Sequence, residues 1–185
     1  ICTKFLKDEG RLVDDLVTVT VMSNLGFHKR AEELGIKVEV TGVGDRYVLE
    51  SMLKTGCVIG GEQSGHVIFL DDNTTGDGLL SALHLLNVMV EEKKPLSELA
   101  KVMEVLPQAL VNAKVPTHKK DAYMEYAEIA EAIGQLEEKF KGEGRVLIRP
   151  SGTEPLVRVM IEGKNQEEIQ ADAECLAELI TKTML

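Results

Sequence analysis

Apolar residues in the N-terminal half of the chain recur with two different periods. The segments with the continuous or alternating pattern of a strand are 16–22, 36–40, 57–59 and 67–70. The segments with helical spacing are 25–34, 47–54 and 79–90. Gly35 and Gly56 follow the first two of these, as expected at helix ends. Strands that alternate with helices predict β-α-β units, and therefore an α/β/α arrangement around a mixed, mostly parallel sheet.

The pattern changes near Leu106, where we place a domain boundary. Pro107 and Pro116 flank an apolar segment that suits an edge strand, because proline interrupts the hydrogen bonds of a central strand. The elements expected beyond the boundary are strands at 108–115, 145–149 and 156–162 and helices at 121–140 and 166–183. We therefore expect an α/β/α domain over residues 1–106 and a smaller α+β domain over residues 107–185.

The charge and the composition of the chain limit which partners and which location we expect. The 185 residues include 31 acidic and 21 basic ones, which gives a formal net charge of −10. This field repels nucleic acid and anionic membranes, so we expect neither as a partner, whereas an anionic small molecule still fits a local group of basic residues. No apolar run approaches the roughly 20 residues that span a bilayer, and residues 1–8 do not resemble a secretory signal. We expect a cytoplasmic protein.

The cysteines and the first residues add two expectations. Cys2, Cys57 and Cys175 are far apart and form no Cys-x-x-Cys pair, which argues against a disulfide framework and against a zinc site. We expect three reduced thiols, at least two of them buried. Ile1 is not a start methionine, and residues 1–6 resemble the interior of an amphipathic helix, so we expect a fragment of a longer protein.

The segment 149–155 separates the last two predicted strands and carries groups suited to an anion. The neighbours of Arg158 are apolar, so Arg158 is expected on the face away from the core, where Arg149 can join it. Two guanidinium groups bind phosphate oxygens through paired, charge-assisted hydrogen bonds, and a glycine between two hydroxyl residues lets backbone N–H groups turn inward. The alternative is an ordinary hairpin with solvated arginines. The candidate phosphate-binding residues are Arg149, Ser151, Gly152, Thr153 and Arg158.

A glycine-rich segment, 60–66, links two strands of the larger domain. In an extended segment residues two apart project to the same side, so Glu62, Ser64 and His66 are expected to line one wall of a cleft. A carboxylate, a hydroxyl and an imidazole suit the hydroxyls and the phosphate of a sugar phosphate. A β-turn with a solvated glutamate is the alternative, and in isolation it is the more common structure.

Three further features are weaker. Asp45 and Arg46 stand where a glycine-containing loop enters a helix, and we treat both as minor site candidates because a ligand can approach such a helix N-terminus. The segment 71–77 partly resembles a calcium loop, but Ala82 occupies the position of the bidentate glutamate, so we expect helix capping and no metal site. His84 lies among leucines and is expected in the core.

Together, the segments 61–66 and 149–155, about 85 residues apart, resemble the sugar-binding and phosphate-binding loops of the α-D-phosphohexomutase family. The resemblance covers the whole chain, as that family's third and fourth domains. Gln63, the stretch 22–27 and the Ser-Gly-Thr-Glu-Pro form of the second loop look most like members that interconvert glucosamine 6-phosphate and glucosamine 1-phosphate.

The resemblance implies an isomerase in which a phosphoserine donates its phosphoryl group, a bisphosphorylated hexosamine reorients, and the enzyme takes a phosphate back, with Mg²⁺ supporting the transfer. Glu62 and Ser64 would then hold sugar hydroxyls, His66 would help position the ligand, and the five residues of the phosphate set would clamp the phosphate that is not reacting. Neither the phosphoserine segment nor the metal loop of the family occurs in these 185 residues. We expect both in N-terminal domains of the same polypeptide, and we expect the chain alone to be inactive and metal-free.

Three alternatives remain open at this point. A phosphomannomutase or phosphoglucomutase shares both loops but accepts a neutral hexose phosphate. A non-catalytic sugar-phosphate-binding module would use the same two loops without any transfer. A structural scaffold would use neither loop for a ligand.

Overall fold

The computed structural model describes residues 1–185, which form two compact units, 1–105 and 106–185. The elements of the first unit are α1 (Cys2–Asp8), the 3-10 turn η1 (Val13–Asp15), β1 (Leu16–Thr20), α2 (Leu25–Glu33), β2 (Lys37–Thr41), α3 (Asp45–Thr55), β3 (Ile59–Gly61), β4 (Val67–Phe69), α4 (Gly78–Glu92), α5 (Leu96–Leu99) and the 3-10 turn η2 (Ala100–Val102). The elements of the second unit are β5 (Gln108–Lys114), the 3-10 helix η3 (Lys120–Glu125), α6 (Ala127–Lys139), β6 (Arg145–Pro150), β7 (Leu156–Glu162) and α7 (Gln166–Met184).

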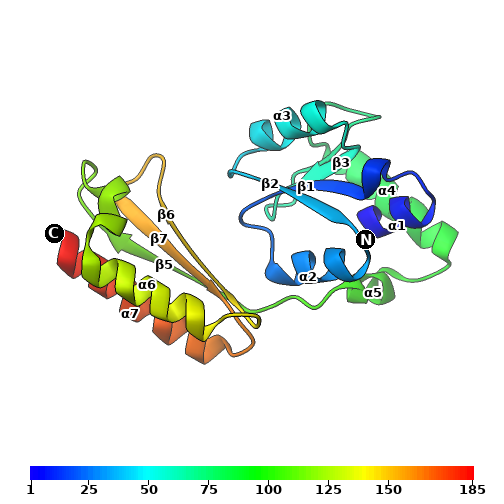
Figure 1. The fold of residues 1–185 in the computed structure, drawn as a ribbon. Helices are drawn as coiled ribbons and strands as arrows, with labels where there is room; N and C mark the ends of the chain where they lie inside the picture. The colour runs from blue at the N-terminus through cyan, green and yellow to red at the C-terminus, as the bar shows by residue number, and fades with distance from the viewer. The chain divides into compact units, whose positions relative to one another are not determined.

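The sheet of the first unit has the order β2-β1-β3-β4. Strand β1 pairs in parallel with both β2 and β3, and β4 runs antiparallel to β3 at the edge. Helix α3 lies on one side of this sheet and α2 on the other (Figure 1). The expected α/β/α arrangement with a mixed, mostly parallel sheet is confirmed.

Each face of this sheet has its own apolar cluster. The cluster under α3 consists of Val48, Met52, Cys57 and Ile68. The cluster on the other face consists of Leu6, Leu12, Val17, Val19, Ala31, Ile36, Ile59 and Phe69. Strand β1 is buried on both faces, because Val17 and Val19 belong to this cluster and Thr18 and Thr20 on the other face are also fully buried.

Helix α4 is the most apolar helix of the chain, yet it is not fully buried. Its N-terminus is capped as expected, since the carboxylate of Asp77 accepts hydrogen bonds from the N–H groups of Leu79 and Leu80. Val88 is its only fully buried residue. One side of the helix, formed by Leu79, Leu83, Leu86 and Val90, is exposed. His84 is half-buried, stacks on Phe69 and lies 2.9 Å from a carboxylate oxygen of Asp72.

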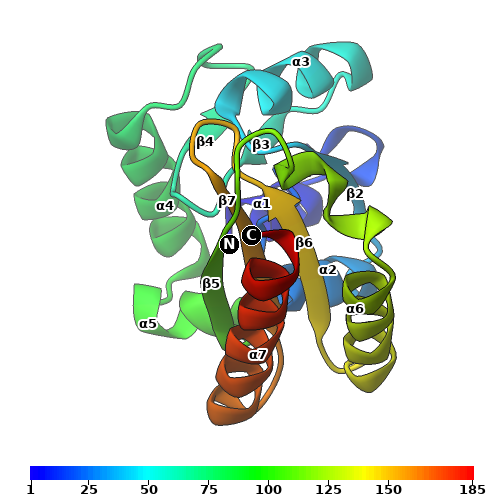
Figure 2. The same ribbon diagram turned by 90° about the vertical axis from the view of Figure 1, so that its left-hand side faces the viewer.

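The second unit is a three-stranded antiparallel sheet with the order β5-β7-β6. Strand β5 is an edge strand, as the flanking prolines predict. Helices α6 and α7 lie on the same side of this sheet (Figure 2). The apolar core of the unit lies between these helices and the sheet. The expected α+β arrangement is therefore confirmed.

One expected helix, 121–140, is divided. Residues 120–125 form η3, Tyr126 adopts an extended conformation with ψ of 112°, and α6 starts only at Ala127. The side chains of η3 form hydrogen bonds with the neighbouring strand and loop, and they do not continue the apolar stripe of a longer helix. This tertiary contact overrides the local helical pattern.

The expectation that at least two cysteines are buried is wrong. Cys57 is buried, Cys2 is partly buried and Cys175 is exposed. In α7 the buried stripe is formed by Ile169, Ala173, Leu176, Ala177, Ile180 and Met184. Position 175 falls on the opposite side of that helix, where a thiol meets solvent. No helix of the structure is long and apolar enough to cross a membrane.

Candidate functional site

The segment that joins β3 to β4 is a tight turn rather than an extended wall. The N–H of Glu62 donates to the carbonyl of His66 at 2.9 Å, and the N–H of Gly65 donates to the carbonyl of Glu62 at 3.0 Å. Gly65 has a φ of +92°, which a residue with a side chain rarely adopts. The extended wall expected for Glu62, Ser64 and His66 is therefore wrong: Ser64 lies exposed in the turn, and the backbone groups of Glu62 and His66 are bonded across it.

Glu62 and His66 both reach the N-terminus of α3. The carboxylate of Glu62 accepts a hydrogen bond from the N–H of Gly44 at 2.9 Å. Nε2 of His66 lies 3.5 Å from a carboxylate oxygen of Asp45. The turn and the loop before α3 thus form one polar cluster, which brings together Glu62, His66 and the minor candidate Asp45.

The other minor candidate, Arg46, does not join this cluster. Its side chain is 82% exposed and pairs with Glu50, one turn along α3, at 2.8 Å. The hydrogen bond from Arg46 lowers the pKa of the Glu50 carboxyl. Arg46 therefore serves the surface of its own helix in this structure.

A groove of about 360 Å³ adjoins the turn. Its polar lining residues are Thr3, Ser23, Asn24, Glu62 and Gln63. Its apolar lining residues include Val17, Val19, Phe27, Ile59 and Val67. The volume lies within the range of small-molecule pockets, and the turn contributes two of the polar groups that can orient a ligand, Glu62 and Gln63.

The loop between β6 and β7 is held by its own first residue. The N–H of Ser151 donates to the carbonyl of Leu156 at 2.9 Å, and the hydroxyl oxygen of Ser151 accepts from the N–H of Glu154 at 3.2 Å. Ser151 is only 3% exposed, whereas Gly152 and Thr153 are exposed. Of the two hydroxyl residues, Thr153 is the one displayed to solvent, and Ser151 maintains the shape of the loop.

Arg149 and Arg158 lie directly opposite each other on β6 and β7. Val157 and Val159, on either side of Arg158, are fully buried, so both arginines lie on the face away from the helices. Burial lowers the pKa of Arg149, and the positive charge of Arg158 lowers it further. Two like charges are thus held side by side, an arrangement that is unfavourable without an anion.

The carboxylate near these two arginines offsets their positive charge only in part. Nη2 of Arg158 pairs with Glu154 at 2.8 Å, and the Glu154 side chain is 53% exposed. Nε of Arg158 is buried and has no hydrogen-bond partner in the protein. An oxyanion in front of both guanidinium groups would satisfy donors that the chain leaves unused.

Two residues of η3 support the loop and were not found from the sequence. Nζ of Lys120 donates to the carbonyls of Ser151 and Gly152, the second at 3.3 Å. The hydroxyl of Tyr123 donates to the carbonyl of Ile148 at 3.2 Å, and burial raises its pKa. Their only sequence signal is a pair of lysines at 119–120, which is common on helix surfaces. Because the ammonium group of Lys120 binds backbone carbonyl groups of the loop, it favours a conformation in which the backbone N–H groups of the loop remain available to a ligand.

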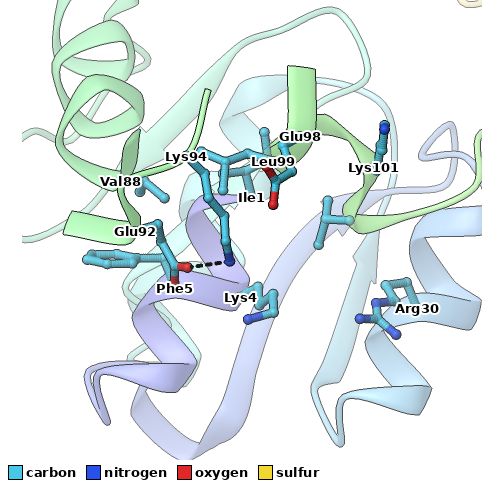
Figure 3. Close-up of a pocket in the computed structure, with 11 residues that line it drawn as sticks. Ile1, Lys4, Phe5, Arg30, Val88, Glu92, Lys94, Glu98, Leu99 and Lys101 are labelled. Carbon is cyan, nitrogen blue, oxygen red and sulfur yellow. Dashed lines mark hydrogen bonds and ion pairs between the residues drawn. The ribbon is translucent and has the colours of Figure 1, made fainter. Parts of the chain in front are cut away.

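A second cavity, of about 170 Å³, lies where α1 approaches α4 and α5. Its charged lining residues are Lys4, Arg30, Glu92, Lys94, Glu98 and Lys101, which Figure 3 shows projecting in different directions. Lys94 pairs with Glu92 at 2.9 Å, and Arg30 pairs with Glu33. No predicted site residue lines this cavity.

Comparison with protein families gives the assignment. Residues 1–106 match the model of the phosphoglucomutase/phosphomannomutase alpha/beta/alpha domain III. The chain belongs to the phosphoglucomutase/phosphomannomutase family. Residues 85–179 match the model of the C-terminal domain of the same family. The resemblance seen in the two loops is thereby confirmed.

Two relatives with high identity are both named phosphoglucosamine mutase. The phosphoglucosamine mutase of Clostridium botulinum (strain Alaska E43 / Type E3) is 61% identical over 97% of the chain, and that of Caldicellulosiruptor bescii is 62% identical over 95%. The chain spans 40% of the first relative and 39% of the second.

Solved structures show the same fold. The N-acetylphosphoglucosamine mutase of Aspergillus fumigatus is 19% identical, covers 99% of the chain with 42% of its own length, and has a TM-score of 0.82. A second structure of that protein, in complex with GlcNAc-6P and magnesium, has a TM-score of 0.81, 18% identity, and covers 100% of the chain with 43% of its own length.

The chain itself does not offer a magnesium site. No group of three or more histidine, cysteine, aspartate or glutamate side chains is arranged to hold a metal ion. The polar cluster at α3 supplies two carboxylates, and one of them already accepts from the N–H of Gly44. These residues do not fit the magnesium ion that phosphoryl transfer needs.

Proposed function

We propose that the chain is the substrate-binding C-terminal part of a phosphoglucosamine mutase, an isomerase that interconverts glucosamine 6-phosphate and glucosamine 1-phosphate. The name shared by relatives at 57–62% identity supports this substrate. The observation that carries the proposal is the pair Arg149 and Arg158, opposed across two strands beside a loop that has exposed N–H and hydroxyl groups.

The phosphate set clamps the phosphate that is not reacting. Arg149 and Arg158 present guanidinium donors, Gly152 and Thr153 add the exposed backbone and hydroxyl groups of the loop, and Ser151 keeps the loop in shape. Holding one phosphate fixed orients the other end of the sugar for transfer, which replaces a bimolecular encounter by a positioned one. The clamp needs no protein group that changes its charge during the reaction.

The turn between β3 and β4 recognises the sugar. Glu62 accepts hydrogen bonds from hydroxyl groups, Ser64 contacts the sugar from the exposed tip, and His66 positions the ligand. Asp45, which lies beside His66, belongs to this site, and Arg46 does not. Because the same sugar is held in two orientations, exposed and adaptable groups suit this task better than a closed pocket.

The remaining parts of the reaction lie outside these residues in our proposal. The transferred phosphoryl group, carried on a serine, and the Mg²⁺ ion that neutralises developing charge belong to N-terminal domains of the same polypeptide. The bisphosphorylated hexosamine is the second ligand of the site described above. A mutase works where its phosphorylated substrates are made, so the proposal includes a cytoplasmic location.

A chimera tests the function directly. The part of the Clostridium botulinum relative that this chain does not span is joined to this chain and assayed with glucosamine 6-phosphate and Mg²⁺. We expect mutase activity within about tenfold of the intact relative, because the two chains are 61% identical over 97% of this chain. The chain alone is expected to show none. A folded chimera without activity, beside an active parent, would contradict the proposal.

A neutral-hexose mutase is the second candidate, favoured by the family model whose description names phosphoglucomutase and phosphomannomutase. The same chimera separates the two when glucosamine, mannose and glucose 6-phosphates are compared by kcat/KM. A preference for glucosamine 6-phosphate supports the first proposal, and a preference for a neutral hexose supports the second. Binding of sugar phosphate without turnover of any substrate would favour a non-catalytic module.

A further inference from the structure

A hydrogen-bond donor and a hydrogen-bond acceptor approach the same ring nitrogen of His66, Nε2. The backbone N–H of Gly76 donates a hydrogen bond to Nε2 at 3.2 Å. A carboxylate oxygen of Asp45 lies 3.5 Å from the same atom. The His66 side chain is 35% exposed, so part of the ring remains open to a ligand.

A neutral imidazole cannot serve both groups. A backbone N–H needs the lone pair of Nε2, whereas a carboxylate needs a proton on that atom. The N–H of Gly76 can only donate, and its contact is the shorter of the two. The hydrogen bond of one ring nitrogen fixes the proton on the other. We propose that Gly76 holds His66 in the tautomer with its proton on Nδ1, so that His66 presents an N–H donor to the bound sugar phosphate.

This assignment defines what His66 can do chemically. A ring with its lone pair occupied at Nε2 and a proton on Nδ1 can donate a hydrogen bond through Nδ1 and has no free lone pair with which to accept a proton from the ligand. The fitting ligand atom is an oxygen with a lone pair, such as a phosphate oxygen or the oxygen of a sugar hydroxyl. This use of the ring rests on the function proposed above, whereas the tautomer does not.

Gly76 also fixes the position of the ring. A Cβ atom at Gly76 would lie 2.5 Å from Nε2 and 2.6 Å from both Cδ2 and Cε1. Such a contact displaces the ring, which is the end of a side chain, rather than the backbone. At Gly78, two residues further along, an added Cβ meets nothing within 4 Å. Gly76 is thus a positioning residue, and Gly78 provides a matched control.

The tautomer is measured on the chain labelled with ¹⁵N-histidine, at a pH where the imidazole is neutral. Long-range ¹H–¹⁵N correlation distinguishes a protonated ring nitrogen from one with a lone pair, and the loss of one set of signals in His66→Asn assigns His66 among the four histidines. We expect the proton on Nδ1 in the wild-type chain and in Asp45→Ala. A proton on Nε2 in the wild-type chain would overturn the proposal, and so would a change of tautomer in Asp45→Ala.

The variants test the part played by Gly76. We expect Gly76→Ala to lose the fixed tautomer, with both ring nitrogens shifting toward averaged positions, whereas Gly78→Ala keeps the wild-type signals. Gly76→Ala with an unchanged tautomer would overturn the role of Gly76. The wild-type measurement decides the tautomer even if a variant fails to fold.

Titration with glucosamine 6-phosphate separates this inference from the proposed function. We expect the Nδ1–H signal of His66 to shift on binding, and Gly76→Ala to bind roughly tenfold more weakly than Gly78→Ala, as expected for the loss of a hydrogen bond to a charged group. Equal affinities of the two variants would overturn the donor role. If the wild-type chain shows the Nδ1 proton but no shift with this probe, the tautomer stands and the sugar-phosphate function is contradicted.

Discussion

At the scale of single residues, the second unit holds two like charges opposite each other at its best candidate site. Arg149 and Arg158 are held opposite each other, with only the half-exposed Glu154 as a partner. At the other end of the same strand, Arg145 pairs with the fully buried Glu162 at 2.8 Å. Strand β6 thus carries Arg145, whose charge is paired within the protein, and Arg149, whose charge is not.

This contrast predicts opposite effects on stability. Replacing Arg149 by Gln removes a like-charge pair, so we expect the free energy of unfolding without ligand to stay the same or rise by up to about 1 kcal/mol. Replacing Arg145 by Gln leaves Glu162 buried without its charged partner, and we expect a loss of roughly 3–5 kcal/mol. Urea denaturation of both variants measures the difference. Equal losses would show that the Arg149 side chain is structural.

The sequence predicted the arginine pair because the alternation around Arg158 is regular and leaves only one face for a charge. It did not predict that Ser151 is buried in its own loop, or that Lys120 binds the loop carbonyls. These contacts join residues far apart in the chain, and no local spacing encodes them. The same is true of Gly76 and His66.

At the scale of elements, the position of the turn between β3 and β4 depends on how closely α3 approaches β3. A Cβ atom at Gly60 would lie 2.6 Å from Sδ of Met52, 2.8 Å from a methyl carbon of Val48 and 3.0 Å from the carbonyl oxygen of Thr18. A glycine here lets the helix pack directly on the strand that leads into the turn. The packing of α3 against Gly60 therefore positions both the helix and the turn.

We expect Gly60→Ala to lower the free energy of unfolding by about 1–3 kcal/mol, the usual cost of overpacking a core. Gly78→Ala, where the added methyl meets open space, should stay within about 0.5 kcal/mol of the wild type. Chemical denaturation followed by circular dichroism provides the comparison. A Gly60→Ala chain as stable as Gly78→Ala would contradict the close packing of α3 on β3.

The order of helices and strands followed from periodicity, with ends that differ by one or two residues in most cases. The two failures have physical causes. The helix expected over 121–140 is split because η3 is held by the strand and the loop beside it. The segment 60–66 predicts either an extended wall or a β-turn, and the positive φ of Gly65 makes it a turn. A glycine is compatible with both conformations, so composition alone could not decide.

At the scale of the whole molecule, our proposal gives this chain the recognition of the ligand and assigns the chemistry of transfer to other domains of the same polypeptide. It spans about 40% of relatives that are named as mutases, and no cluster of its side chains is arranged to hold a metal ion. Both loops were predicted from the sequence because glycines, hydroxyl residues and arginines are concentrated there. The tertiary environment of those loops could not be predicted, because it depends on residues contributed by α3, η3 and the segment before α4.

This division predicts that Mg²⁺ has no effect on the chain by itself. We expect the midpoint of thermal unfolding to be the same, within about 1 °C, in millimolar MgCl₂ and in EDTA, because a ligand stabilises only the state that it binds. Differential scanning calorimetry measures it. A midpoint that rises steadily with the concentration of Mg²⁺ would reveal a metal site within these residues.

We propose that an oxyanion is bound between Arg149 and Arg158. This proposal is tested most directly by following the guanidinium Nε–H signals of the ¹⁵N-labelled chain while glucosamine 6-phosphate is added. We predict that the signals of these two arginines shift together along one binding curve and that Arg158→Gln weakens the affinity at least tenfold. Lys141→Gln, which removes an exposed charge from the turn between α6 and β6, should change the affinity less than twofold. Arginine signals that do not respond, or equal losses in the two variants, would contradict the account.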